Sequence, residues 1–144
     1  MDQDPWAALD ERWHEVQRLL RNRVRRMVRD RWAGPVGGAA FQILGTLLRE
    51  GPASPADLAA RLDIRSSTMS AHLDRLEEAG WVERQPLAGA GGRLRVVSTE
   101  AGRHAFEEYL VRRRAIVAEL FGGLDENERR QLERLPERVM APRQ

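Results

Sequence analysis

The order of elements predicted in residues 55–98 constrains the fold more than any other feature of the sequence. "PADLAARL" begins with Pro55, which suits the first position of a helix, and it predicts about two helical turns. "LDIR" at 62–65 interrupts this helix, and Asp63 can adopt the left-handed backbone that a tight turn needs. "SSTMSAHLDRLEEAG" then predicts a second helix that ends at Gly80. Two short helices joined by a four-residue turn form a helix-turn-helix unit.

A β-hairpin is predicted directly after this unit, in "WVERQPLAGAGGRLRVVS". Its strands lie near residues 81–85 and 93–98, around a tip rich in alanine and glycine. The alternation of the second strand places Arg93 and Arg95 on the face opposite its apolar residues. The fold class that follows is mainly α with a small β-hairpin wing, a winged helix-turn-helix.

The second helix of the unit has one apolar face and one hydroxyl-rich face. At about 100° per residue, Met69, Leu73 and Leu76 fall on the core side. Residues 64–73 contain no acid, whereas three acids occupy the C-terminal half of the helix. This asymmetry predicts that the N-terminal half approaches phosphates. With the wing arginines added, the candidate DNA-binding residues are Arg65, Ser66, Ser67, Thr68, Ser70, Ala71, Arg75, Arg93 and Arg95.

These residue types suit different parts of a duplex. Arg65 has the long side chain best placed to reach a guanine, and the hydroxyls can donate to phosphates or base edges. Arg93 and Arg95 could enter an adjacent minor groove or contact the phosphates that border it. In a second interpretation, the serines only cap the helix and the wing arginines are solvated.

Long amphipathic helices are predicted on both sides of the unit. Apolar residues recur every three or four positions from Trp6 to Met27, which predicts one helix with an apolar stripe roughly 30 Å long. Gly34 and Pro35 are predicted to end it. A stripe of this length exceeds what a compact domain of this size would cover, so a partner chain is expected. The predicted division is an N-terminal dimerisation helix (1–33), a winged helix-turn-helix DNA-binding domain (38–98) and C-terminal dimerisation helices (99–140).

Three residues are predicted to cap helices. Ser54 precedes Pro55, Thr99 opens "TEAG", and Asp125 forms a capping box with Glu128. A short and largely buried helix is also predicted in "FQILGTLL".

The arginine run of residues 18–32 holds seven arginines and a single acid. All 24 cationic residues of the chain are arginines, yet the formal net charge is only +2, so the distribution of charge matters more than its sum. Arg18, Arg21, Arg25 and Arg29 fall on the side away from the apolar stripe, which is typical of a solvated helix face. A membrane-surface role is disfavoured, because the apolar face already has a predicted partner.

The chain resembles the MarR family of bacterial transcription regulators over nearly its whole length. The most specific motifs are "LDRLEEAGWVER" and "TEAG" at their spacing. The resemblance implies a homodimer joined through the first and last helices, with two recognition helices about one DNA turn, near 34 Å, apart on a pseudo-palindromic operator in double-stranded DNA. It also implies a repressor that a small-molecule effector releases.

Three departures from the family pattern affect the expected DNA contacts. The wing tip reads "AGAGGR", without the acid that commonly precedes its arginine, and Arg93 is the nearest match. Arg65 replaces a serine before the recognition helix, so Ser66 is expected to cap that helix. Ala71 stands where relatives often have arginine. Direct base contacts are therefore expected to be few, with DNA shape and water-mediated contacts contributing more.

Three residues are candidates for binding an effector. Trp13 and His14 lie on the first helix where the resemblance implies a pocket, although interface packing is the favoured role of Trp13. Arg113 falls within the apolar arc of the fifth helix, where an unpaired charge would be costly. We expect Arg113 to pair with an acid across the dimer interface or to bind an anionic effector, and pairing is favoured.

Other classes of function have little support in the sequence. The absence of cysteine excludes thiolate metal sites, which argues against the ArsR-type sensors that "SAHLDRL" also resembles. His14, His72 and His104 are too dispersed to suggest a metal site, and no cofactor is predicted. No catalytic motif occurs, so an enzyme is not expected. The lack of a long apolar segment predicts a cytoplasmic protein. The alternative function is a winged-helix module that binds proteins and no DNA.

Overall fold

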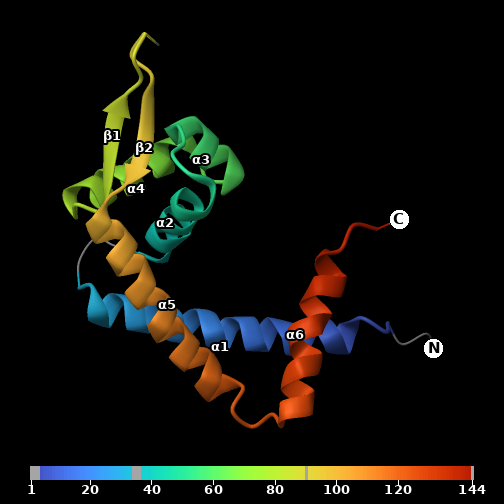
Figure 1. Cartoon of the computed structure of the whole chain (residues 1–144). Coiled ribbons are helices and arrows are strands. Elements are labelled where there is room, and N and C mark those ends of the chain that lie inside the picture. Colours follow the sequence, from blue (N-terminus) through green and yellow to red (C-terminus); the bar gives the residue numbers. More distant parts are fainter. Residues whose placement is uncertain (1–3, 34–36, 90, 144) are drawn as a thin grey trace.

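Eight elements follow one another in the computed structural model, which describes residues 4–33, 37–89 and 91–143 (Figure 1). They are α1 (Ala7–Arg31), α2 (Gly38–Glu50), α3 (Pro55–Arg61), α4 (Ser66–Glu78), β1 (Val82–Pro86), β2 (Leu94–Ser98), α5 (Glu100–Leu120) and α6 (Glu126–Met140). The helices α2, α3 and α4 and the hairpin gather at one end of the molecule (Figure 1). The helices α1 and α5 pack against each other at the other end. The fold is mainly α with a β-hairpin wing, as the sequence predicts.

The predicted helix caps are confirmed by their hydrogen bonds. Ser54 Oγ accepts from the Asp57 amide at 3.1 Å, and Thr99 Oγ1 accepts from the Gly102 amide at 3.1 Å. Asp125 and Glu128 form the reciprocal bonds of a capping box. Each cap satisfies a backbone N–H that has no partner inside its own helix. These helix starts therefore depend on neighbouring residues alone.

The turn of the helix-turn-helix has the predicted backbone. Asp63 has a φ of 52°, in the left-handed region, and Gly80 follows α4 with a φ of 79°. The predicted stop at Gly34 and Pro35 lies outside the described residues. Among the described residues, α1 ends at Arg31.

The core lies where α2, α3 and α4 meet the hairpin. Met69, Leu73 and Leu76 of α4 are at most 1% exposed, which confirms the predicted inward face. The other large side chains buried to the same extent are Phe41, Ile43, Leu44, Leu58, Val82 and Val96. A face built at helical spacing thus closes against the inward side of the wing.

The wing is a two-stranded antiparallel sheet, with its strands one residue displaced from the predicted start of each. The pairing runs from Val82 opposite Ser98 to Pro86 opposite Leu94. Ala53 adds an isolated bridge to Val96, with backbone hydrogen bonds of 3.2 and 2.7 Å. Leu94 is 38% exposed because the strands project beyond the core toward the tip (Figure 1).

The residue that caps α5 forms hydrogen bonds with the residues that follow α4. The Thr99 amide donates to the Trp81 carbonyl at 3.0 Å, and Thr99 Oγ1 donates to the Gly80 carbonyl at 2.6 Å. A Cβ at Gly102 would lie 2.2 Å from the Trp81 carbonyl oxygen, so this close approach requires glycine. The glycine of the "TEAG" motif therefore permits α5 to lie directly on the winged unit.

An aromatic cluster joins α1 and α5 to the core. Phe41 stacks on Tyr109 with ring centroids 4.3 Å apart, and it also contacts Trp32 and Trp81. Ion pairs add to the α1–α5 contact: Arg31 Nε lies 2.7 Å from Glu108 Oε2, and Arg23 pairs with Glu119. Two arginines of the run thus bind α5 instead of solvent.

The apolar stripe of α1 is covered only near its C-terminal end. Val28 is 2% exposed, whereas Trp6, Leu9 and Trp13 are 69%, 57% and 45% exposed. The helix α6 has no buried residue in its described span, and its Val139 is 82% exposed. Apolar surface of this extent is unusual on a monomeric protein. Among the helices of the described ranges, none is long and apolar enough to cross a bilayer.

Candidate nucleic-acid interface

The N-terminal half of α4 presents an exposed, acid-free surface. The predicted contact residues Arg65, Ser66, Ser67, Thr68, Ser70 and Ala71 are all exposed, as is Arg75 one turn further on. Met69 lies among them and points into the core at 1% exposure. The sequence thus places hydroxyls and one arginine on the outside of the helix while the apolar side chains hold it in place.

The cap of α4 differs from the prediction. Arg65 occupies the N-cap position, with ψ at 144°, and its carbonyl accepts from the Met69 amide at 2.8 Å. Ser66 is already helical, and no side-chain hydrogen bond caps the helix, so the expectation that Ser66 takes over as cap was wrong. The side chain of an arginine has no hydrogen-bond acceptor, so it cannot cap the amides of a helix start. The first amides of α4 therefore stay available to an anion, on the side where the helix dipole is positive.

The C-terminal half of α4 is acidic, and Arg84 of β1 neutralises part of it. Arg84 Nη2 donates to Asp74 Oδ1 at 2.8 Å and to the Ser70 carbonyl at 3.2 Å, while its Nε lies 3.5 Å from Glu77 Oε2. Its side chain is 24% exposed. The candidate list from the sequence missed Arg84. Its position two residues after Val82, on the inward side of the strand, was the available signal, because a charge there needs a partner.

The wing arginines have different surroundings. Arg95 donates to Gln85 Oε1 across the hairpin at 3.2 Å, so its direction is partly set. Arg93 is exposed at the base of the tip, and its carbonyl accepts from the Leu87 amide at 2.9 Å. Both arginines line a groove of about 930 Å³ between the wing and residues 52–57. The wing therefore presents two cations beside the start of α3.

His72 is the titratable group on α4 whose pKa the fold changes. Its side chain is half-buried, and burial, followed by the nearby charge of Arg75, lowers the pKa of His72 below its ordinary value of 6.5. Both causes disfavour the imidazolium. His72 therefore adds no cation to this surface at neutral pH.

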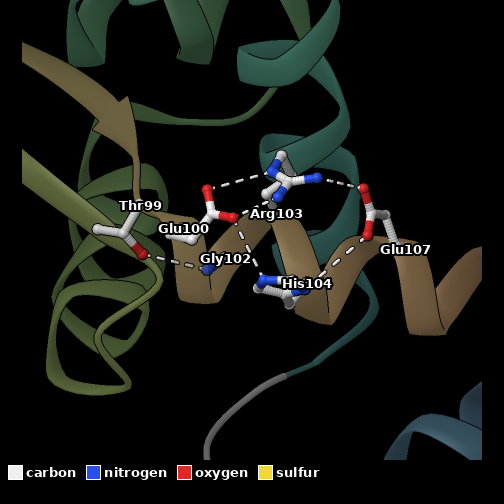
Figure 2. A network of polar contacts seen from close by, with 6 residues as sticks. All are labelled: Thr99, Glu100, Gly102, Arg103, His104 and Glu107. Atoms are coloured by element: carbon white, nitrogen blue, oxygen red, sulfur yellow. Dashed lines mark hydrogen bonds and ion pairs between the residues drawn. The ribbon is translucent and has the colours of Figure 1, made fainter.

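A second polar network lies at the start of α5 (Figure 2). Arg103 bonds Glu107 at 2.6 Å and Glu100 at 3.2 Å, and His104 approaches both carboxylates. The hydrogen bond from Arg103 holds the pKa of Glu100 below its ordinary range and raises that of Arg103. All of these bonds stay within one helix, so the network stiffens α5 and connects it to no other element.

The candidate effector residues are all exposed in the single chain. Trp13 is 45% exposed, and His14 and Arg113 are exposed. Arg113, which is predicted to fall within the apolar arc of α5, has an exposed side chain in the single chain. Its pairing across a dimer interface and its binding of an anion stay predictions. No group of acids and histidines in the described ranges could hold a metal ion.

Comparison with known proteins agrees with this architecture. Residues 35–93 match the sequence profile of the MarR family. A segment of 65 residues, 43% of the chain, is 40% identical to the HTH-type transcriptional regulator PecS of Dickeya dadantii (strain 3937). The match spans only 39% of the length of PecS.

Solved structures of MarR proteins share the fold over the whole chain. Wild-type apo MarR from E.coli superposes with a TM-score of 0.82 at 22% identity, over 98% of this chain and all of that one. A MarR family protein from Bacillus stearothermophilus gives a TM-score of 0.82 at 23% identity, over 96% and 95% of the two chains. A mutant MarR from E.coli complexed with operator DNA gives 0.71 at 22% identity, over 96% and 100%. The sequence of residues 35–93 is therefore similar to that of the MarR family, and the chain as a whole has the fold of the MarR structures.

Proposed function

We propose that the chain is a transcriptional regulator that binds double-stranded DNA through α4 and the wing. The observation that carries the proposal is the exposed, acid-free N-terminal half of α4, with its amides uncapped by any side chain, on the same winged unit as Arg93 and Arg95. Helix N-termini and hydroxyls suit phosphates, and a single long arginine suits a guanine edge. Two matched proteins support this, since PecS is named a transcriptional regulator and one matched MarR structure contains operator DNA.

The active form in this proposal is a homodimer. The exposed apolar residues of α1 and α6 support it, because each helix carries an uncovered apolar stripe that a second copy could bury. The division proposed is residues 1–33 and 99–140 for dimerisation and residues 38–98 for DNA binding. A two-fold axis would set two α4 helices against a pseudo-palindromic operator, about one helical turn of DNA apart.

The regulator acts as a repressor by occluding a promoter, and a small molecule releases it. Trp13, His14 and Arg113 are proposed to contact that effector or, for Arg113, an acid of the second copy. Binding near the junction of the long helices and the winged unit would change the separation of the two α4 helices. Comparison of Arg113→Ala with the wild type, in dimer stability and in effector response, tests both roles, and two unchanged results would eliminate them.

The main alternative is a winged-helix module that binds proteins and no DNA. The hydroxyl-rich outer face of α4 and the wing arginines favour DNA. No catalytic step is assigned to the chain.

The test is titration of the full chain against its own upstream DNA and a scrambled duplex, at two salt concentrations. We expect specific binding whose affinity falls steeply with salt, because phosphate contacts release counterions. A protein that is dimeric yet shows no preference for the upstream DNA would support the protein-binding alternative.

Single substitutions then separate base contacts from phosphate contacts. Arg65→Ala is expected to cost about 1–3 kcal/mol of binding free energy on the operator and to relax sequence preference. Arg93→Ala is expected to weaken binding to both duplexes to a similar extent. If Arg65→Ala reduces operator and scrambled binding equally, Arg65 does not contact a base.

A further inference from the structure

Arg84 projects from the hairpin toward the recognition helix. It alternates with Glu83, which is exposed, and shares the inward side of β1 with Val82, which is 1% exposed. Its partner residue on β2 is Val96, which is fully buried. The guanidinium therefore extends along the edge of the core to α4.

The acceptors of Arg84 lie on one side of α4. They belong to Ser70, Asp74 and Glu77, which are spaced by four and three residues and so stand above one another on the helix. A guanidinium is planar and holds its donors at fixed angles. Contacts to successive turns therefore restrain both the rotation of α4 about its axis and its position along β1.

The contacts of Arg84 with α4 lie next to the surface proposed to contact DNA, but they are not part of it. Ser70 is one of the candidate contact residues, and its carbonyl accepts from Arg84 while its hydroxyl side remains exposed. Asp74, one turn further on, would repel phosphates if it were unpaired. Arg84 thus orients this part of α4 and reduces its negative charge.

The neighbouring residue of β1 orients the other half of the interface. Gln85 faces away from Arg84 along the strand, and its Oε1 accepts from Arg95 at 3.2 Å. Gln85 and Arg95 are directly opposite in the register of the hairpin. One short strand therefore contacts α4 through Arg84 and the wing arginine through Gln85.

We infer that Arg84 is a positioning residue that holds α4 and the wing at one angle, so that both engage the same duplex together. Arg84 itself binds no phosphate or base. The expected effect of Arg84 on DNA affinity rests on the proposed function. The restraint that its contacts with α4 place on the wing is a property of the protein alone.

The structure supplies a matched control in Arg103. Like Arg84, Arg103 pairs with two carboxylates, Glu100 and Glu107, but both belong to its own helix α5 (Figure 2). Arg103→Ala therefore removes an arginine and two ion pairs without releasing one element from another.

The first measurement is amide hydrogen exchange of the full chain without DNA. Arg84→Ala is expected to raise amide exchange on the order of tenfold at the β1–β2 hydrogen bonds and at the Leu87 amide, which donates to the Arg93 carbonyl. Arg103→Ala should leave the exchange of these amides unchanged. Unchanged exchange of the wing in Arg84→Ala overturns the inference, whether or not the wild type binds DNA. A wild type without specific binding and a loosened wing in Arg84→Ala would refute the proposed function alone.

The second measurement is a double-mutant cycle on operator DNA with Arg84→Ala and Arg93→Ala. Arg84→Ala is expected to weaken operator binding about tenfold and Arg103→Ala to have little effect. In the Arg84→Ala background, Arg93→Ala should reduce operator affinity much less than in the wild type. The reason is that the wing is no longer held at the angle at which it and α4 contact the duplex together. Additive losses, together with a salt slope reduced by about one, would mean that Arg84 contacts a phosphate itself and would overturn the inference.

Two further variants keep the result interpretable if Arg84→Ala folds poorly. Asp74→Asn retains the Arg84 bond to the Ser70 carbonyl and is expected to give a smaller rise in wing exchange in the same direction. Arg84→Lys keeps the charge but has no planar fork, so it should restore only part of the operator affinity. Full restoration by lysine would mean that charge alone matters, and it would overturn the role in orientation.

Discussion

The winged unit and the terminal helices differ in how completely they bury their apolar residues. In the winged unit, Leu58, Leu73 and Val96 are fully buried. In the terminal helices, Trp6 of α1 and Val139 of α6 are 69% and 82% exposed although they lie on apolar stripes of similar regularity. An apolar stripe predicts that a face will be buried, but it does not tell whether the cover comes from the same chain or from another.

The arginines also show that a sequence pattern does not tell which groups a side chain contacts. The densest positive charge of the sequence lies on α1, where Arg23 and Arg31 pair with α5. The helix α4, which is proposed to contact DNA, has far fewer arginines. The two surfaces differ in the groups that surround each arginine.

The largest effect is expected in the winged unit. Leu73→Ala removes a fully buried side chain and should lower the free energy of unfolding by about 2–5 kcal/mol. Urea unfolding at several protein concentrations measures it. The loss should be the same at each concentration, and a loss that disappears at high concentration would mean that Leu73 is buried only in an oligomer.

The terminal helices should respond through association. Replacing Leu9 and Trp13 by alanine is expected to weaken the homodimer by about 2–4 kcal/mol, mainly through Trp13, because tryptophans buried at the centre of an interface carry much of its binding energy. Sedimentation equilibrium measures the dimer constant. The matched control is Leu87→Ala on the wing, where the side chain is similarly exposed at 39%. An equal effect of control and variant would place the dimer contact elsewhere.

A smaller effect is expected for the arginine face of α1. Neutralising Arg25 and Arg29 to glutamine should slow DNA association severalfold at low salt and leave sequence preference unchanged, because these charges only raise the local potential. Stopped-flow association at two ionic strengths measures this. Altered sequence preference would show that α1, and not only α4, contacts bases.

The smallest effect concerns the pH dependence of stability. The pKa of His72 is lowered in the folded chain, so the unfolded chain binds more protons as the pH falls through 6.5. The contribution of His72 is therefore fully present above that pH and is lost as the pH falls through the folded pKa. The unfolding free energies of wild type and His72→Gln should diverge between pH 7.5 and pH 5.5, with the wild type losing more stability on acidification. Parallel curves would contradict the burial of His72.

Much of the fold could be predicted from local sequence. The caps at Ser54, Thr99 and Asp125 and the turn at Asp63 follow from residues at most three positions apart, and all four are confirmed. The cap of α4 was the exception, because the sequence alone did not indicate that Arg65 would occupy the cap without a side-chain bond. Local sequence therefore predicts most element boundaries, but it does not predict whether a side chain caps an exposed helix start.

The candidate site could be predicted only in part. The outward positions of Ser67 and Ser70 follow from helical periodicity, whereas the contact between Arg84 and Asp74 depends on how the hairpin folds back over α4. The role of Arg113 stays a prediction for the same reason, since it depends on which groups contact its exposed side chain.

Local sequence is enough to predict where most helices begin and turn, which faces are apolar, and that a hydroxyl-rich helix precedes a basic wing. These properties depend on backbone geometry and on residues within one or two helical turns. The folded chain is needed to show that Arg84 reaches α4, that Arg31 pairs with Glu108, and that the apolar stripe of α1 is covered at one end. Such contacts join residues distant in sequence, and their free energy depends on burial and distance, which no local pattern records.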